Sequence, residues 1–328
     1  MRMETLTCAV LLLLYQESCG AVEVRPSANP AVVGSSVTLS LSPSSSLNSG
    51  SWAVGEYLIL TWSRLGDQDQ VAVYPDHLGR ASIDAGRALT LTSLSVNDSG
   101  LYTMKSTDPK LSASLSLTVL EPIVNVTTNA SVSPLVEHRS TAVALCSVSS
   151  GSSVSFAWFN SSSEVVVSDR VRLTEGNATL SIVTISRYDQ GPFTCLASNP
   201  VSNATSDPVD FTIYYGPDNM NVTLGSHTTG SNVTAVCTAQ SNPAARMHWT
   251  FGGELLNSSG SELELYHVTK EQSGLYSCVA FNNETKLSHN VTGFLQIKDA
   301  NSGSDRPKAV WILRLLCLAE LMFTFWDI

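Results

Sequence analysis

Four cysteines in the middle of the chain are the residues whose types and spacing best predict a chemical role, and that role is disulfide bonding. The chain has seven cysteines in 328 residues. Cys8 and Cys19 lie in an apolar N-terminal segment and Cys317 in an apolar C-terminal one, and segments of both kinds are typically removed during processing. The remaining cysteines form an even set, as expected of a chain folded in an oxidising compartment: Cys146, Cys195, Cys237 and Cys278.

Patterns for catalysis or metal binding do not occur in the sequence. The six histidines are scattered without ligand spacing, and there is no nucleophile, nucleotide-binding or zinc-binding motif. A formal net charge of −10 without any basic cluster argues against nucleic acid as a partner. We therefore expect no enzymatic activity, no cofactor, no metal and no small-molecule substrate.

Asparagines that could carry N-linked sugars are much more frequent than chance predicts. Eleven match the acceptor pattern N-x-S/T, where roughly four would be expected from the composition. Asn97 is the one match in the first third of the chain, and we leave it out because it adjoins a tight turn. The predicted glycosylation sites are Asn125, Asn129, Asn160, Asn177, Asn203, Asn221, Asn232, Asn257, Asn283 and Asn290. Sugars on the later domains and a first domain without them are typical of a recognition protein, because contact with a partner requires exposed protein surface.

A repeated motif indicates the elements that position the cysteines. "RYDQGPFTC" at 187–195 and "EQSGLYSC" at 271–278 each end on the second cysteine of a pair, and twelve residues after each first cysteine comes Trp158 or Trp249. Cys, Trp and Cys at these intervals are typical of an immunoglobulin sandwich, where the indole covers a disulfide between the sheets. The sequence therefore predicts two disulfides, Cys146 with Cys195 and Cys237 with Cys278.

The first third of the chain contains the same motif without cysteines. "NDSGLYTMKS" at 97–106 has Met104 at the cysteine position, and "GSSVTLSLS" has Leu41 at the other. We expect buried apolar contact to replace the disulfide there, and Arg80 to pair with Asp98. "YLILTWSR", with Trp62, is interpreted as the central C strand. Leu41 and Met104 are 63 residues apart, which leaves room for the extra C′ and C″ strands of a variable-type domain.

The predicted fold is all-β: three tandem immunoglobulin-like sandwiches, one variable-type without a disulfide followed by two of C2/I type. The expected segments are a signal peptide at 1–20, sandwiches at 21–120, 121–215 and 216–297, a polar linker at 298–308, and a hydrophobic segment at 309–328. That last segment, interrupted by Arg314 and Glu320 and without a basic flank, resembles a GPI signal with attachment at Asn301 or Ser302. The alternatives are a membrane-spanning segment without a cytoplasmic tail, and a secreted or truncated splice form.

The run "SNPVSNATSDPVDFTIYYGPD" at 198–218 resembles the joint between C2-type domains in the carcinoembryonic-antigen-related cell adhesion molecules. A first domain without cysteines but with an intact "DSGLYT" corner is also characteristic of that family. The CD2 and signalling-lymphocyte-activation receptors share the missing disulfide, but they typically carry two extracellular domains, so a third domain favours the first family. The resemblance implies cell–cell adhesion or immune recognition through the first domain, and GPI anchoring fits several members.

The predicted contact surface is the sheet of strands G, F, C, C′ and C″ in the first domain, to which the resemblance also points. Strand alternation around Trp62 predicts that Leu58 and Leu60 face the core. The residues predicted to face outward are Tyr57, Ile59, Thr61, Thr103 and Lys105.

Two function classes follow from these observations. The first is a cell-surface adhesion glycoprotein that binds cell-surface proteins, including itself in trans or in cis, on the extracellular side of the plasma membrane. The second is a non-signalling immune receptor or decoy of the CD2 kind that binds a different ligand. Mixing expressing with non-expressing cells would discriminate them, because self-adhesion sorts the expressing cells together.

Overall fold

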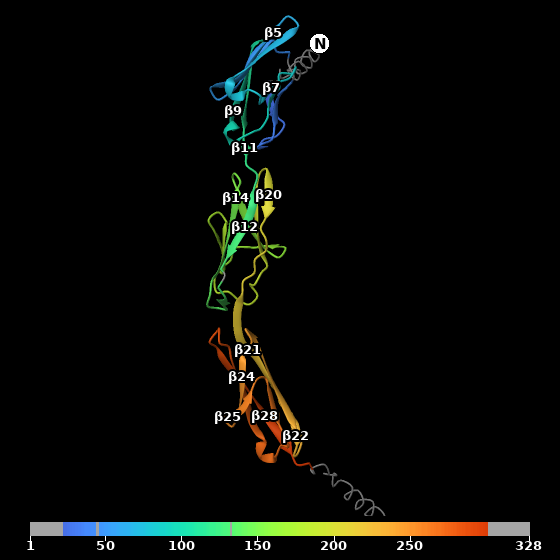
Figure 1. The fold of residues 1–328 in the computed structure, drawn as a ribbon, viewed down its shortest axis with the longest axis vertical. Coiled ribbons are helices and arrows are strands. Elements are labelled where there is room, and N and C mark those ends of the chain that lie inside the picture. Colours follow the sequence, from blue (N-terminus) through green and yellow to red (C-terminus); the bar gives the residue numbers. More distant parts are fainter. Residues whose placement is uncertain (1–21, 44–45, 132, 301–328) are drawn as a thin grey trace, which may run out of the picture. The chain divides into compact units, whose positions relative to one another are not determined.

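The computed structural model describes residues 22–43, 46–131 and 133–300. These residues form three β-sandwiches that follow one another along the sequence (Figure 1). Residue contacts divide the described part of the chain into two compact units: one comprises the described residues up to Ser131 together with Ala142–Val183 and Gly191–Phe211, the other 133–141, Thr184–Gln190 and the described residues from Thr212 onward. No helix among the described residues is long and apolar enough to cross a membrane. The predicted signal peptide and the predicted attachment residues Asn301 and Ser302 lie outside the described residues.

The first sandwich consists of a five-stranded sheet packed on a four-stranded sheet. The five-stranded sheet has the order β10 (Lys110–Leu117), β9 (Gly100–Asp108), β4 (Ser49–Val54), β5 (Tyr57–Leu65) and β6 (Gln68–Val73). These strands are G, F, C, C′ and C″ in the lettering of immunoglobulin domains. The other sheet has the order β1 (Glu23–Pro26), β3 (Val37–Ser42), β8 (Leu89–Leu91) and β7 (Ala81–Ile83), and β11 (Val119–Leu120) pairs with β2 (Ala31–Val32). Two short 3-10 helices, η1 (Pro75–His77) and η2 (Val96–Asp98), lie in the connections.

Strand C of the first sandwich is β4, and its central tryptophan is Trp52 rather than Trp62. Trp52 lies opposite Met104 in the sheet, as Trp158 lies opposite Cys195 and Trp249 opposite Cys278. The prediction that placed strand C at "YLILTWSR" is therefore wrong, since these residues form β5, the C′ strand.

In the first sandwich, buried apolar side chains take the place of the disulfide between the sheets, as predicted. Val37 pairs with Leu91 as Ala142 pairs with Ile182 in the second sandwich. Leu41 follows Val37 by the same four residues that separate Cys146 from Ala142, so Leu41 occupies the position of the first disulfide cysteine. Leu41 and Met104 both belong to the buried cluster between the two sheets. Burying each of two such side chains contributes about 1.5–3 kcal/mol, which can offset most of the roughly 4 kcal/mol expected of a disulfide that closes a loop of this length.

The second sandwich has two four-stranded sheets, and Cys146 and Cys195 form the predicted disulfide in it. One sheet has the order β12 (Val124–Ala130), β14 (Ala142–Ser150), β18 (Thr179–Ile182) and β17 (Val171–Thr174). The other has the order β16 (Ser163–Glu164), β15 (Ser155–Asn160), β19 (Phe193–Asn199) and β20 (Ser202–Thr205). Trp158 is fully buried, and its indole N–H donates to the carbonyl of Asn177 at 3.0 Å.

The third sandwich contains the second predicted disulfide, Cys237 with Cys278. Its first sheet contains β21 (Ile213–Thr223), β23 (Val233–Asn242) and β26 (Glu262–Leu265), and β13 (Leu135–Val136) pairs with Ile213 and Tyr214 at the start of β21. The other has the order β22 (Ser226–Thr228), β28 (Ser288–Lys298), β27 (Gly274–Phe281), β24 (Arg246–Phe251) and β25 (Glu254–Ser259), and η3 (Lys270–Gln272) precedes β27. The expected boundary at 215–216 falls inside β21, which is one continuous strand.

The corner that precedes β9 is fixed by Asp98 and Tyr102. The Tyr102 hydroxyl donates to the carbonyl of Asp98 at 2.7 Å, and the Asp98 carboxylate accepts from Arg80 at 2.6 Å and from the backbone N–H of Ser95 at 2.7 Å. This confirms the predicted pairing of Arg80 with Asp98. Burial alone would raise the pKa of Asp98, but the hydrogen bonds from Ser95 and Arg80 outweigh it and lower that pKa. Burial, with the nearby charge of Asp98, raises the pKa of Tyr102 to about 12.

Candidate recognition surface

The outer face of the five-stranded sheet, called the outer face below, is built from two neighbouring rows of aligned side chains. The backbone register alone fixes these rows, because residues paired directly across strands point to the same side of a sheet. One row runs Ser112, Lys105, Ser51, Thr61 and Ala72 across β10, β9, β4, β5 and β6. The next row runs Ser114, Thr103, Ala53 and Leu58.

Three of the five residues predicted for this surface, Thr61, Thr103 and Lys105, are brought together in these rows. Ile59 is not among them, because its side chain is completely buried. Its outward placement was therefore wrong. Tyr57 is 75% exposed, but it pairs with Val54, which in turn pairs with the buried Tyr102, so it lies at the end of an inward-facing row.

A β-bulge explains both corrections. The register of β5 against β4 shifts between Trp52, opposite Leu60, and Ala53, opposite Leu58, so Ile59 is an extra residue. An extra residue reverses the alternation beyond it. Leu58, which alternation from Trp62 had placed in the core, is consequently 38% exposed and in register with Ala53. The outer face thus includes a leucine where a tyrosine and an isoleucine were expected.

The buried side chain of Arg87 links β6 to the core of the first sandwich through hydrogen bonds. The guanidinium of Arg87, whose side chain is only 4% exposed, donates to both carboxylate oxygens of Asp69 at 2.7 and 3.0 Å. It also donates to the carbonyl of Leu47 at 3.1 Å, while its own carbonyl accepts the indole N–H of Trp52 at 3.0 Å. The hydrogen bond from Arg87 lowers the pKa of Asp69. These contacts fix the position of the C″ strand, which has a neighbour on one side only.

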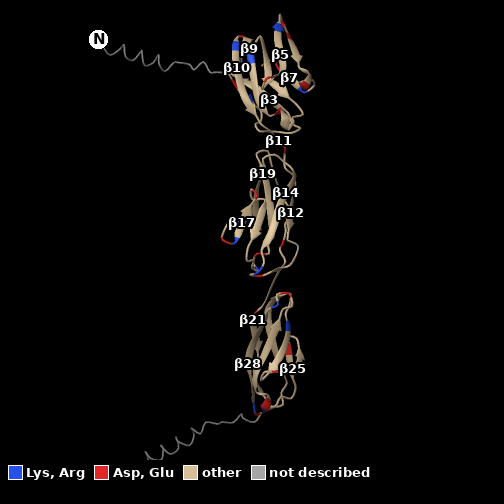
Figure 2. Ribbon diagram, turned by 90° about the vertical axis from the view of Figure 1, so that its left-hand side faces the viewer, with Lys and Arg blue, Asp and Glu red and all other residues tan. Residues whose placement is uncertain are grey.

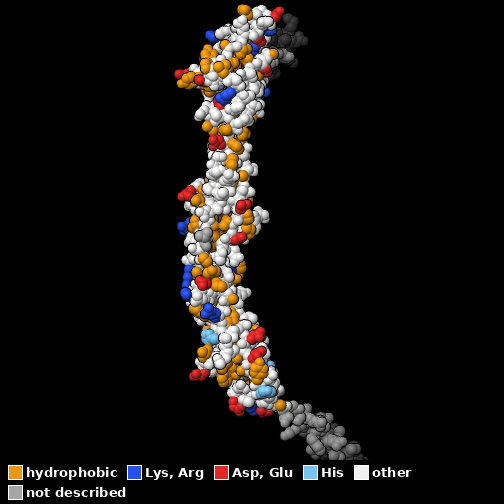
Figure 3. Space-filling view, viewed as in Figure 1, with side chains coloured by type: hydrophobic (Ala, Val, Ile, Leu, Met, Phe, Trp, Pro, Cys, Tyr) orange, Lys and Arg blue, Asp and Glu red, His pale blue; other side chains and the backbone are white. Residues whose placement is uncertain are grey.

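Apolar side chains also reach the surface of the first sandwich, as Figure 3 shows on its visible face. They belong largely to β5, β6 and the segments that follow them: Tyr57, Leu58, Leu65, Val71, Tyr74 and Leu78 are all exposed. Scattered exposed apolar residues are normal on protein surfaces. Leu58 belongs to the outer face, and the concentration of the others on the C′ and C″ strands and the segment after them is the feature that favours a contact surface here.

The predicted glycosylation residues lie on the second and third sandwiches, and nine of the ten are exposed. Asn160, in β15, is half-buried. Asn97, which we left out of the predicted set, is exposed in η2 at the corner before β9, outside the strands of the five-stranded sheet. None of the acceptor asparagines in the described residues therefore lies on a strand that forms the outer face.

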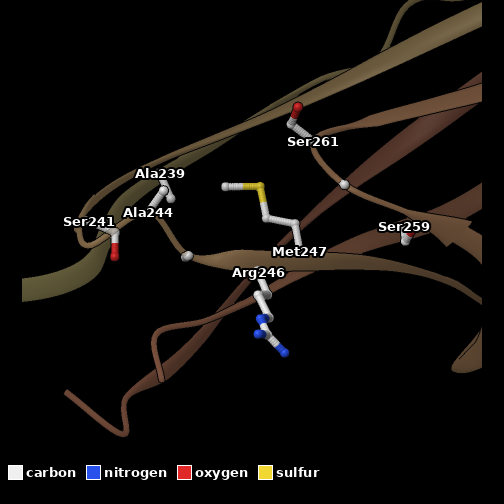
Figure 4. Close-up of a pocket in the computed structure, with 9 residues that line it drawn as sticks. Ala239, Ser241, Ala244, Arg246, Met247, Ser259 and Ser261 are labelled. Atoms are coloured by element: carbon white, nitrogen blue, oxygen red, sulfur yellow. The ribbon is translucent and has the colours of Figure 1, made fainter. Parts of the chain in front are cut away.

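The described residues offer little for sites of other kinds. No group of His, Cys, Asp or Glu there could hold a metal ion. A hollow in the third sandwich is lined mainly by alanine, serine and glycine, together with Arg246 and Met247. In Figure 4 the side chain of Met247 extends toward Ala239 and Ala244, whereas that of Arg246 points away from them. A hollow with this lining has no set of groups for acid–base or nucleophilic chemistry.

Comparison with known proteins agrees with the fold and the repeat pattern. The family model described as immunoglobulin domain matches residues 121–199 and 219–282. The cell adhesion molecule CEACAM16 of Mus musculus is 25% identical over 295 residues, which are 85% of this chain and 69% of that protein. Murine CEACAM1b superposes with a TM-score of 0.51 at 21% identity, covering 59% of this chain and 98% of that one.

The full ectodomain of mouse nectin-like molecule 4 also superposes, with a TM-score of 0.52 at 14% identity, covering 84% of this chain and 99% of that chain. At these identities the solved structures show the shared fold alone, while the match to CEACAM16 extends along most of the sequence. CEACAM16 is named as a cell adhesion molecule. The expectation that this chain has no enzymatic activity stays a prediction. Two segments of the chain match the immunoglobulin domain family, and the chain is similar to the carcinoembryonic-antigen-related cell adhesion molecules CEACAM16 and CEACAM1b.

Proposed function

We propose that this chain is a cell-surface glycoprotein that recognises another cell-surface protein through the outer face of its first sandwich. One contrast supports this proposal. The predicted glycosylation residues all lie on the second and third sandwiches, while the outer face has no acceptor asparagine on its strands. Glycans keep a stalk soluble, whereas contact between proteins requires bare protein surface.

The composition of the outer face suits a weak contact that many copies make together. Thr103 on β9 and Ala53 on β4 have small side chains and lie between Ser114 on the edge strand β10 and the aliphatic Leu58 on β5. Individually weak contacts become strong when many copies engage across two apposed membranes. The partner is either another copy of this chain, in trans or in cis, or a different cell-surface protein.

We further propose that a GPI anchor at Asn301 or Ser302 holds the protein on the extracellular side of the plasma membrane. The order of small residues, polar spacer and apolar end supports the proposal. Phosphatidylinositol-specific phospholipase C should release the protein from expressing cells. Full retention of the surface signal after verified enzyme treatment would favour the tailless span instead.

A second candidate function is a non-signalling receptor or decoy of the CD2 kind, which binds a different ligand. The first sandwich without a disulfide, with Leu41 and Met104 in the cysteine positions, resembles those receptors as well. Mixing labelled expressing cells with non-expressing cells separates the possibilities. Clusters of expressing cells alone indicate homophilic adhesion, and mixed clusters indicate a ligand on the other cells. If no clusters form at an expression level verified by antibody, the proposed adhesion is wrong and the decoy function is favoured.

A further inference from the structure

A groove lies at the end of the β9–β10 hairpin, at the edge of the five-stranded sheet. It is lined by residues that form three consecutive cross-strand pairs: Lys105 with Ser112, Ser106 with Leu111, and Thr107 with Lys110. Both lysines belong to outward-facing positions, because each is separated by an even number of residues from Thr103 or Ser112 in its own strand. Figure 2 shows basic residues in this part of the first sandwich, on β9 and β10.

The two lysines differ from the other basic residues of the first sandwich. Each of the four arginines has a carboxylate within 4.0 Å: Arg25 with Glu23, Arg64 and Arg87 with Asp69, and Arg80 with Asp98. Among the described residues, Lys105 and Lys110 have no such partner, and both side chains are exposed. The nearby Asp108 accepts a hydrogen bond from Asn48 at 3.2 Å. The groove therefore has two positive charges without an ion-pair partner.

The groove also adjoins backbone groups that could pair with another strand. β10 is the edge strand of its sheet and is hydrogen-bonded within it to β9 only, while β1 of the other sheet lies near it. The carbonyl of Ser116 accepts from the side chain of Asn29 at 2.8 Å, and the N–H of Thr118 donates to the same side chain at 2.9 Å. Even-numbered residues of this segment therefore direct their backbone groups away from β9. At Ser112 and Ser114 those groups face the open edge.

From these observations we infer that this edge binds an extended acidic peptide segment of a protein partner, which adds to the sheet as a sixth strand beside β10. Backbone hydrogen bonds to Ser112 and Ser114 would supply affinity, and the lysines would supply selectivity. Lys105 and Lys110 are diagonal neighbours, so their Cβ atoms lie up to about 7–8 Å apart. Acidic side chains at alternate positions of an extended peptide repeat at roughly 6.5–7 Å. The expected ligand pattern is thus two carboxylates separated by one residue.

Protection of the edge against aggregation is the alternative explanation for a lysine on β10. It accounts for Lys110 but not for Lys105, which lies on β9, inside the sheet. Because Ser112 is small, the long side chain of Lys105 can extend over it toward the edge. The inference rests on the proposed recognition role of the first sandwich and names the chemistry of its partner.

The test measures binding of a fluorescent peptide in which glutamate alternates with threonine to the purified full-length protein in detergent. Lys105→Gln and Lys110→Gln should each weaken binding about two- to fivefold, as expected for exposed ion pairs. Ser112→Pro, which removes one outward N–H, should weaken binding about two- to tenfold without loss of the native melting transition. Lys286→Gln, an exposed lysine of the third sandwich, is the matched control and should bind as the wild type does.

Several results would overturn the inference. They are no measurable binding, equal binding of a peptide with glutamine in place of glutamate, and full binding by either the Lys105→Gln or the Ser112→Pro variant. Self-association of Lys110→Gln together with unchanged peptide binding would show that this lysine only protects the edge. If these tests fail while substitutions on the outer face still abolish cell adhesion, the proposed function stands and only its acidic partner is wrong.

Discussion

Met104 lies directly opposite Trp52 in the five-stranded sheet, at the position that the disulfide cysteines Cys195 and Cys278 occupy opposite Trp158 and Trp249. The three sandwiches therefore share one packing scheme, in which a buried tryptophan covers the contact between the sheets. In the first sandwich that contact is made by a methionine and a leucine. The scheme depends on shape and burial, so the disulfide is replaceable by apolar side chains of suitable volume.

Introducing a disulfide between the two sheets of the first sandwich should therefore be possible. In a Leu41→Cys, Met104→Cys variant we expect a new disulfide, because both positions match those of Cys146 and Cys195 in strand register. The oxidised form should exceed the reduced form in unfolding free energy by up to about 4 kcal/mol. Mass spectrometry of the unreduced protein and chemical denaturation measure the two quantities. A Leu39→Cys, Met104→Cys control, shifted along the strand by roughly 7 Å, should keep free thiols. A free-thiol result for the Leu41 pair would show that the register is wrong.

The ion pair between Arg87 and Asp69 predicts that a double variant lacking both charges melts at a higher temperature than a variant lacking only the Asp69 charge. Asp69→Ala should lower the melting temperature, because it leaves the buried guanidinium of Arg87 without its counter-charge. Adding Arg87→Met to that variant should raise the melting temperature again, since the unpaired buried charge is removed and most of its volume is refilled. Differential scanning calorimetry of the two variants decides the question. A double variant that melts below Asp69→Ala would show that the hydrogen bond from Arg87 to Leu47, not the charge pair, dominates.

The corner carboxylate predicts a dependence of stability on acid pH. The folded-state pKa of Asp98 is lowered, so its contribution is present above its unfolded pKa of about 3.9 and is lost as pH falls through the folded-state value. The difference in melting temperature between the wild type and Asp98→Asn should therefore be largest near neutral pH and shrink as the pH falls below about 3.9. A difference that stays constant over this range would show that the Asp98 charge does not stabilise the corner.

The sequence predicts some parts of this molecule because single side chains determine them. The corner at Asp98 and Tyr102 and the two disulfides depend on particular residues at fixed spacing, and these features appear in the structure as expected. Trp52 was missed because its strand, "SGSWAV", is rich in serine and glycine and has low strand propensity. Gly50 is nevertheless suited to this strand, because a side chain there would collide with the carbonyl of Lys105 and the ring of Trp62. The spacing from Leu41, close to the twelve residues between Cys146 and Trp158, could have indicated Trp52.

The bulge at Ile59 shows why the outer face could be predicted only in part. Alternation from one buried residue extends along a strand until an extra residue reverses it. Thr61, on the same side of the bulge as Trp62, was placed correctly, whereas Leu58 and Ile59 were not. Apolar runs such as "YLIL" give no sign of a bulge, because leucine, isoleucine and tyrosine are each compatible with either face. Lys105 was predicted to face outward, but the lack of an ion-pair partner at Lys105 and Lys110 could not be predicted, because it is a property of the folded surface.

The central claim is that the outer face of the first sandwich carries recognition, and one substitution tests it most directly. Thr103→Arg places a long charged side chain at the middle of that face. Thr90→Arg is the matched control on the outer side of the opposite sheet, where Thr90 contacts the hydroxyl of Thr38 at 3.0 Å much as Thr103 contacts that of Ser114 at 3.3 Å. At equal surface expression, we expect Thr103→Arg to abolish cell adhesion, whether to expressing or non-expressing cells, and Thr90→Arg to preserve it. Normal adhesion by Thr103→Arg would contradict the account.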